Sequence, residues 1–97
     1  MVRLEIKSDI KDINAIIISA INAELKRMEI GLHKTDQEIR KFEDKYKVTS
    51  DIFLEQYAAE DLDGGDDEYI SWMGEIKIKE KIAEELNELK NIEYVTH

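Results

Sequence analysis

The chain has 97 residues, of which 14 are Lys or Arg and 23 are Asp or Glu, so its formal net charge is −9 and its pI is near 4.7. This balance argues against direct binding to DNA or RNA, because phosphate contacts need clustered Lys or Arg. The sequence has no Cys for disulfides or metal-thiolate chemistry, and its longest apolar run, from Ala15 to Ile18, is far shorter than the roughly 20 residues that span a bilayer. We therefore expect one small soluble domain over residues 1–97, located in the cytoplasm.

The first segment has the pattern of a β-strand. From Val2 to Lys7, apolar and charged residues alternate with the two-residue period of a strand that buries one face. A single strand is not stable alone, so it needs a partner. The only other strand-like segment is Ile92 to His97, and the two could pair within one chain or between two chains.

A long helix follows, from near Ile10, after a capping Ser8 or Asp9, to about Tyr46. Its apolar residues recur every three or four positions, with Thr35 as the one polar member. Such a helix would be roughly 55 Å long, which exceeds the diameter of a 97-residue globule, so it bends, breaks near Gly31 or packs against a second copy. We favour a homodimer whose seam contains Ile17, Ile21, Leu25, Met28, Leu32 and Ile39.

Two pairs of opposite charges at four-residue spacing support the second half of this helix. They are Asp36 with Arg40 and Glu43 with Lys47. Each pair is worth about 0.3 kcal/mol on an exposed helix face.

Two further helices are expected after Val48. Thr49 can cap a short helix from Ser50 to about Glu60, and Val48 can pack on Phe53 at its start. A turn at residues 63–66 separates it from a final helix that runs from about Asp67 to Lys90 and has two adjoining apolar faces. The expected fold is mainly α, a short N-terminal strand and an antiparallel helical hairpin.

The whole net charge comes from one stretch, Val48 to Ile76, which contains nine acids and no Lys or Arg, while the rest has 14 of each sign. This stretch also contains four of the seven aromatic residues, the residue type that often anchors interfaces. It predicts a surface for a basic protein partner, although the acids could instead form a solvated turn and Trp72 could be a core residue. The predicted partner-binding residues are Asp66, Asp67, Glu68, Tyr69 and Trp72.

Catalytic and metal-binding patterns are missing from the sequence. The two histidines, His33 and His97, have no Ser or Cys nucleophile arranged beside them, and His33 follows Glu29 by four residues as in a solvated helix pair. Read as an EF-hand from Asp61, the acidic turn has Asp66 and Trp72 where Gly and Glu are required. We expect no enzyme, no cofactor and no dedicated metal site.

Several motifs in the middle of the chain are similar to those of TumA-type antitoxins, small prokaryotic proteins known mainly from archaea and cyanobacteria that pair with TumE-type toxins. The resemblance covers roughly Phe42 to Leu89 and includes the junction Lys45-Tyr46-Lys47-Val48-Thr49-Ser50, then Phe53-Leu54-Glu55, Asp66-Asp67-Glu68 and Trp72-Met73-Gly74. The matching positions are Tyr46, Thr49, Ser50, Phe53, Asp67 and Trp72.

The resemblance implies an antitoxin of a type II toxin–antitoxin pair that neutralises an RNase-like toxin encoded by the neighbouring gene. Many such antitoxins also carry a basic DNA-binding region, which this sequence lacks. The alternative is a helical structural or adaptor protein that self-associates through its long helix and has no toxin to neutralise.

Overall fold

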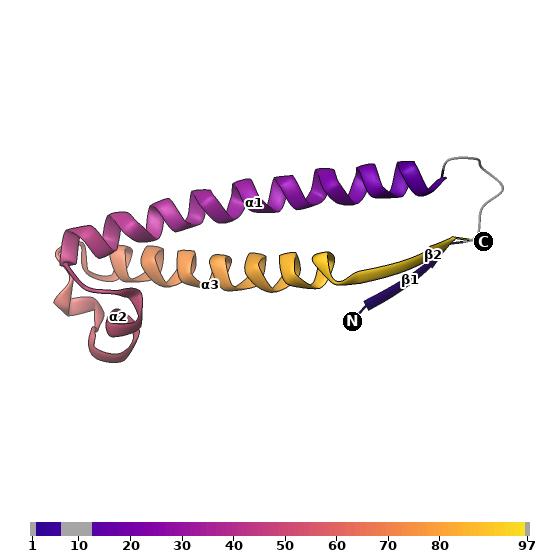
Figure 1. Cartoon of the computed structure of the whole chain (residues 1–97). Coiled ribbons are helices and arrows are strands. Elements are labelled where there is room, and N and C mark those ends of the chain that lie inside the picture. The colour runs from indigo at the N-terminus through magenta and orange to yellow at the C-terminus, as the bar shows by residue number, and fades with distance from the viewer. Residues whose placement is uncertain (1, 7–12, 97) are drawn as a thin grey trace.

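The computed structural model describes residues 2–6 and 13–96 (Figure 1). The chain is mainly helical and its two long helices form an antiparallel hairpin, which confirms the expected fold class at that level. The proposed helix start near Ile10 and its caps Ser8 and Asp9 lie outside the described residues, as does His97. The elements are β1 (Val2–Ile6), α1 (Ile13–Tyr46), α2 (Ser50–Gln56), the 3₁₀ helix η1 (Ala59–Asp61), α3 (Gly65–Lys90) and β2 (Ile92–Thr96).

The hairpin is long and thin. Its Cα atoms extend over 60 × 20 × 18 Å, with a radius of gyration of 19.1 Å. A compact chain of this length would have a radius of gyration of about 13 Å. Helix α1 is unbroken at Gly31, where a Cβ would meet Ile82 of α3 only at 3.6 Å, an ordinary contact distance. The long helix therefore packs on α3 without the break that was one of the expected alternatives.

Helix α1 ends at Tyr46 because Lys47 adopts a left-handed backbone conformation with φ of 57°. Thr49 then starts α2, since its hydroxyl accepts a hydrogen bond of 3.3 Å from the amide of Ile52, which confirms the predicted cap.

Helix α2 is shorter than expected. It ends at Gln56, because the chain is extended at Tyr57 and the amide of Ala58 donates to the Asp61 carboxylate at 2.8 Å, which starts η1 instead. Helix α3 begins at Gly65, two residues before the predicted start, and Gly65 has a positive φ of 58° that favours glycine.

The two strands lie at the far end of the hairpin from α2 (Figure 1). They form a parallel two-stranded ladder within the single chain, in a register that pairs Val2 with Ile92 and Ile6 with Thr96. Because β2 follows α3 after Asn91 alone, the ladder continues the line of α3 beside the first turns of α1.

The buried core lies at one end of the hairpin, which we call the head (residues 35–76). The rest of the described hairpin, residues 13–34 and 77–92, is called the arm, and there only Leu86 is buried. No helix among the described residues has the length and hydrophobicity needed to cross a membrane. The buried residues of the head are Thr35, Ile39, Phe53, Leu62, Trp72 and Ile76.

The expected dimer seam faces the chain's own α3. Ile39 is 4% exposed in the head core, so it cannot pack on a second copy, and that part of the seam prediction is wrong. Ile21 and Leu25 line a groove together with Leu89 of α3, and Leu32 lies near Lys79 of α3. Ile17 and Met28 are half-buried. The segment between α1 and α3 reverses the direction of the chain. Helix α3 therefore packs an apolar face on α1, where a second copy was expected.

The left-handed residue at the end of α1 gives a first prediction. Lys47→Gly should raise the free energy of unfolding by up to about 1 kcal/mol, because glycine adopts this conformation without the steric cost that lysine has there. The matched control is Lys77→Gly in the middle of α3, which should lower stability by about 1 kcal/mol. Urea denaturation measures both, and a loss of stability in Lys47→Gly would contradict the assigned backbone conformation.

Candidate functional site

The head is built around Trp72, whose side chain is completely buried. Its ring stacks on Phe53 of α2 with centroids 3.8 Å apart and planes within 4°. Two rings of α1 are also nearly parallel to it, Phe42 at 5.4 Å and Tyr46 at 5.9 Å. Because these rings come from all three α-helices, the stack fixes α2 against the end of the hairpin.

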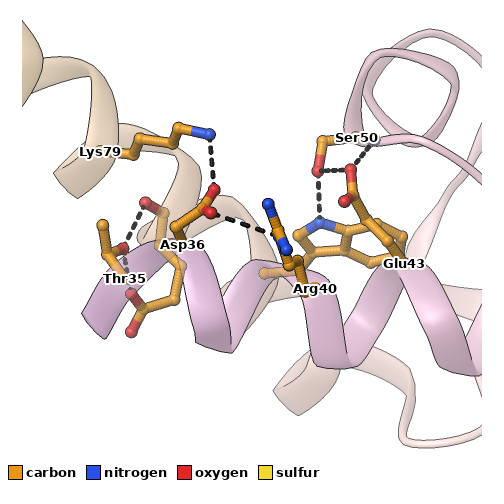
Figure 2. A network of polar contacts seen from close by, with 8 residues as sticks. Thr35, Asp36, Arg40, Glu43, Ser50 and Lys79 are labelled. Atoms are coloured by element: carbon orange, nitrogen blue, oxygen red, sulfur yellow. Dashed lines mark hydrogen bonds and ion pairs between the residues drawn. The ribbon is translucent and has the colours of Figure 1, made fainter. Parts of the chain in front are cut away.

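A polar chain satisfies the one hydrogen-bond donor of this buried indole (Figure 2). The Nε1 of Trp72 donates to the Ser50 hydroxyl at 3.0 Å, and that hydroxyl donates to the Glu43 carboxylate at 2.9 Å. The same carboxylate oxygen accepts from the backbone amide of Ser50 at 2.7 Å. An acid of α1 therefore holds both the first residue of α2 and the tryptophan of α3.

Glu68 connects the first turn of α3 to the end of α1. Its carboxylate accepts from Lys45 Nζ at 2.8 Å, from the Tyr46 hydroxyl and from the Gly64 amide at 2.5 Å. These donors favour the ionised form, Lys45 most strongly, and lower the pKa of Glu68 to about 2. Tyr46 in turn accepts from the amide of Asp63 at 3.0 Å, so this network also orders the acidic turn.

Two polar contacts join α1 and α3 next to the head (Figure 2). The buried Thr35 hydroxyl donates to the backbone carbonyl of Glu75 at 3.0 Å and also contacts its carboxylate. Asp36 accepts from Lys79 at 2.8 Å and pairs with Arg40 at 3.3 Å, and the hydrogen bond from Lys79 is the main cause that lowers the pKa of Asp36. These contacts fix the register of the hairpin.

The five predicted partner-binding residues differ in how exposed their side chains are. Trp72 is fully buried in the chain's own core, so its prediction as a partner contact is wrong. Tyr69 is half-buried with its ring 5.2 Å from Phe53, and Glu68 is held by the contacts described above. Asp66 and Asp67 are exposed in the first turn of α3. Of the five predicted residues, Asp66 and Asp67 are therefore the most accessible to a partner.

The exposed acids of the head extend well beyond Asp66 and Asp67. We call this set the acidic surface: Asp51, Glu55, Glu60, Asp63, Asp66 and Asp67, all of them exposed. Large aliphatic side chains of the same end of the molecule are exposed as well, with Ile70 at 68%, Leu54 at 41% and Ile52 at 38%. The head thus presents both carboxylates and apolar side chains to solvent.

Some important head residues could not be assigned from the sequence. The four-residue spacing suggested that Glu43 pairs with Lys47, whereas in the structure its carboxylate binds Ser50. The signal was present in part, because Ser50 starts a helix that follows Glu43 after a short connection. The predicted pair of Asp36 and Arg40 is confirmed at 3.3 Å.

A groove of about 380 Å³ lies beside this network, between α1, the start of α2 and α3. Its lining includes Glu43, Ser50 and Asp51 on one side and Lys79 and Glu80 on the other. Among the described residues, no cluster of three or more His, Asp or Glu side chains is placed to hold a metal ion.

A structural role for Trp72 predicts a large loss of stability on truncation. Trp72→Ala should lower the free energy of unfolding by about 3–5 kcal/mol, because it removes the largest side chain of the core. Ile70→Ala, two residues away and 68% exposed, should change it by less than about 0.5 kcal/mol. If urea denaturation gave the two variants equal stability, the buried stack would be refuted.

The lowered pKa of Glu68 predicts a specific acid sensitivity. A carboxyl whose folded-state pKa is about 2, against an ordinary value of 4.5, contributes stability that is present above pH 4.5 and is lost as the pH falls through about 2. Glu68→Gln should therefore be less stable than the parent protein at pH 7, with the difference shrinking between pH 4.5 and 2. Urea denaturation across this range measures it, with Glu84→Gln in the arm as the control; a difference independent of pH would contradict the network.

Comparisons with known proteins identify no relative of this chain. No family model, no curated protein and no solved structure matches the chain. The resemblance to TumA-type antitoxins is therefore not tested by them and stays a prediction.

Proposed function

We propose that this chain is a non-catalytic protein-binding module whose acidic surface binds a basic protein. More specifically, we propose that this protein acts in the cytoplasm as the antitoxin of a type II toxin–antitoxin pair and neutralises an RNase-like toxin. The observation that carries the proposal is the separation of charge: nine acids and no Lys or Arg occur between Val48 and Ile76.

The contacts within the head support this use of the charge. Three of the nine acids have roles inside the fold, since Glu68 holds Lys45 and Tyr46, Asp61 accepts from a backbone amide, and Glu75 contacts Thr35. The other six form the acidic surface and are exposed. Asp51, Asp66 and Asp67 also lie in the first turn of a helix, where a negative charge is favourable. The six like charges nevertheless repel one another, and a partner of opposite charge would relieve that repulsion.

An RNase suits this surface for a physical reason. An enzyme that holds RNA phosphates needs Lys and Arg on its binding surface, and carboxylates can occupy that surface in place of the phosphates. Charge complementarity of this kind mainly speeds association and selects the partner. The exposed Ile52, Leu54 and Ile70 would supply apolar contacts, a role that the sequence had suggested for Trp72.

A second candidate is the self-associating structural or adaptor protein. It is favoured by the arm, where the eleven residues from Ile13 to Ala23 contain no charged side chain although α1 is exposed there at Ile16 and Ile18. A homodimer is compatible with both functions, because the acidic surface and this part of α1 lie at opposite ends of the hairpin (Figure 1).

The proposed function predicts that binding depends on the acidic surface. Asp63→Asn, Asp66→Asn and Asp67→Asn combined should weaken affinity for the product of the adjacent gene at least tenfold and reduce the salt dependence of binding. The matched control replaces three exposed acids of the arm, Glu84, Glu85 and Glu88, by glutamine. Calorimetric titration at low and high salt compares the two triple variants, and equal affinities would rule out the acidic surface as the binding site.

A growth assay separates the two candidate functions. The adjacent gene is expressed alone and together with this chain, and the two proteins are tested for a complex by pull-down. Growth arrest that this chain relieves, together with a stable complex, would support the antitoxin. If the adjacent gene is not toxic and no complex forms, the self-associating protein is the candidate that remains.

A further inference from the structure

One side of α1 in the arm is apolar except for Arg27 and is not covered by α3. Ile16 is 55% exposed and Ile30 is 62% exposed, and the alanines between them are exposed as well. Their steps of four, three, four and three residues keep these positions on one side of the helix. We call this set the outer stripe: Ile16, Ala20, Ala23, Arg27 and Ile30.

The first three turns of α1 have the composition of a helix that neighbours cover. From Ile13 to Ala23 the helix has no charge on any side, which is typical of a helix enclosed by neighbours. Helix α3 ends at Lys90, beside the groove that Ile21 and Leu25 line. The start of α1 therefore extends past the end of α3 and has the β1–β2 ladder beside it on that side only, as Figure 1 shows.

The apolar face continues from α1 onto α3. A groove between the two helices is lined by Gly31, Lys34, Thr35 and Glu38 of α1 and by Glu75, Ile78 and Ile82 of α3. Ile78 is 48% exposed. The uncovered face is thus broader than one helix and lies on one side of the hairpin.

The charges of the arm favour a second copy as the occupant. The arm carries six acids and seven bases, whereas the head carries thirteen acids and four bases. A basic partner is therefore attracted to the head and has no reason to choose the arm, while two nearly neutral arms do not repel each other.

The order of side chains along the outer stripe also fits a two-fold interface, in which one surface must be complementary to itself. Ile16 and Ile30 each lie seven residues from Ala23. An antiparallel pair of α1 helices centred on Ala23 therefore places Ile16 of one copy beside Ile30 of the other, with the small alanines where the helices approach most closely. The single cation, Arg27, is paired with Glu24 at 2.8 Å within its own helix.

We propose that two copies of this chain associate through their outer stripes, antiparallel, with the two-fold axis near Ala23. Phe42 of each copy would lie about 19 residues from that axis, so the two heads would be roughly 57 Å apart. This separation is many times the Debye length of about 8 Å at physiological salt, so the acidic heads do not oppose association. The proposal does not depend on toxin binding by the head.

The mass in solution tests self-association. Size-exclusion chromatography with light scattering should give twice 11.3 kDa for the parent protein and 11.3 kDa for the double variant Ile16→Glu, Ile30→Glu. The control Ile70→Glu changes an isoleucine of the head that is 68% exposed and should remain a dimer. A monomeric parent protein would overturn the proposal, and so would a double variant that remains dimeric.

Disulfide cross-linking tests the arrangement in a protein that stays dimeric, and the chain has no native cysteine to interfere. Ala23→Cys should cross-link to itself, and a mixture of Ile16→Cys and Ile30→Cys should form mixed dimers. Ile16→Cys alone should not cross-link, because in the antiparallel pair the two positions are roughly 21 Å apart and a disulfide needs Cα atoms within about 7 Å. Efficient cross-linking of Ile16→Cys alone would show a parallel pair and overturn the proposed arrangement.

Discussion

The stack of Trp72 on Phe53 is the contact on which the rest of the head depends. It joins α2 and α3, and the parallel rings of Phe42 and Tyr46 attach both to α1. Burial of the indole without a partner for its N–H would be costly, and Ser50 supplies that partner while Glu43 holds Ser50. Since Glu68 also binds Tyr46, the acidic turn is fixed to the same stack. The exposed carboxylates therefore lie on a packed support, which would lower the cost of ordering them in the proposed complex with a basic partner.

The sequence predicts the helices well because their signals are local. Apolar spacing and the Thr49 cap place α1 and the start of α2, and the structure agrees. The direction of individual side chains depends on contacts between distant segments, so Trp72 and Ile39 were wrongly expected to face partners. The same reason explains Glu68, whose donors Lys45 and Tyr46 lie more than 20 residues earlier in the chain. A pattern of acids and aromatics marks a segment as unusual, but only packing shows which of its side chains remain exposed.

The two ends of the molecule have different physical characters. The head combines the buried core with the entire net charge, since its excess of nine acids equals the charge of the chain. The arm is nearly neutral and weakly buried, with Leu86 as its one buried residue among those described. Hydrophobic stabilisation grows with the area removed from water, so the arm gains little from the hairpin alone and would gain more from a second copy. Because the acidic surface and the uncovered apolar side of α1 lie at opposite ends of the molecule, the proposed binding of a basic partner and the proposed self-association would not compete.

Hydrogen–deuterium exchange of the protein alone and mixed with the product of the adjacent gene tests this division most directly. If the head binds the basic partner and the arm binds a second copy, backbone amides between Ser50 and Glu68, where the acidic surface lies, should gain protection, and exchange between Ile13 and Lys34 should be unchanged. New protection confined to Ile13–Lys34 would contradict this division, because the adjacent gene product would then bind the arm and the acidic surface would have no part in recognition.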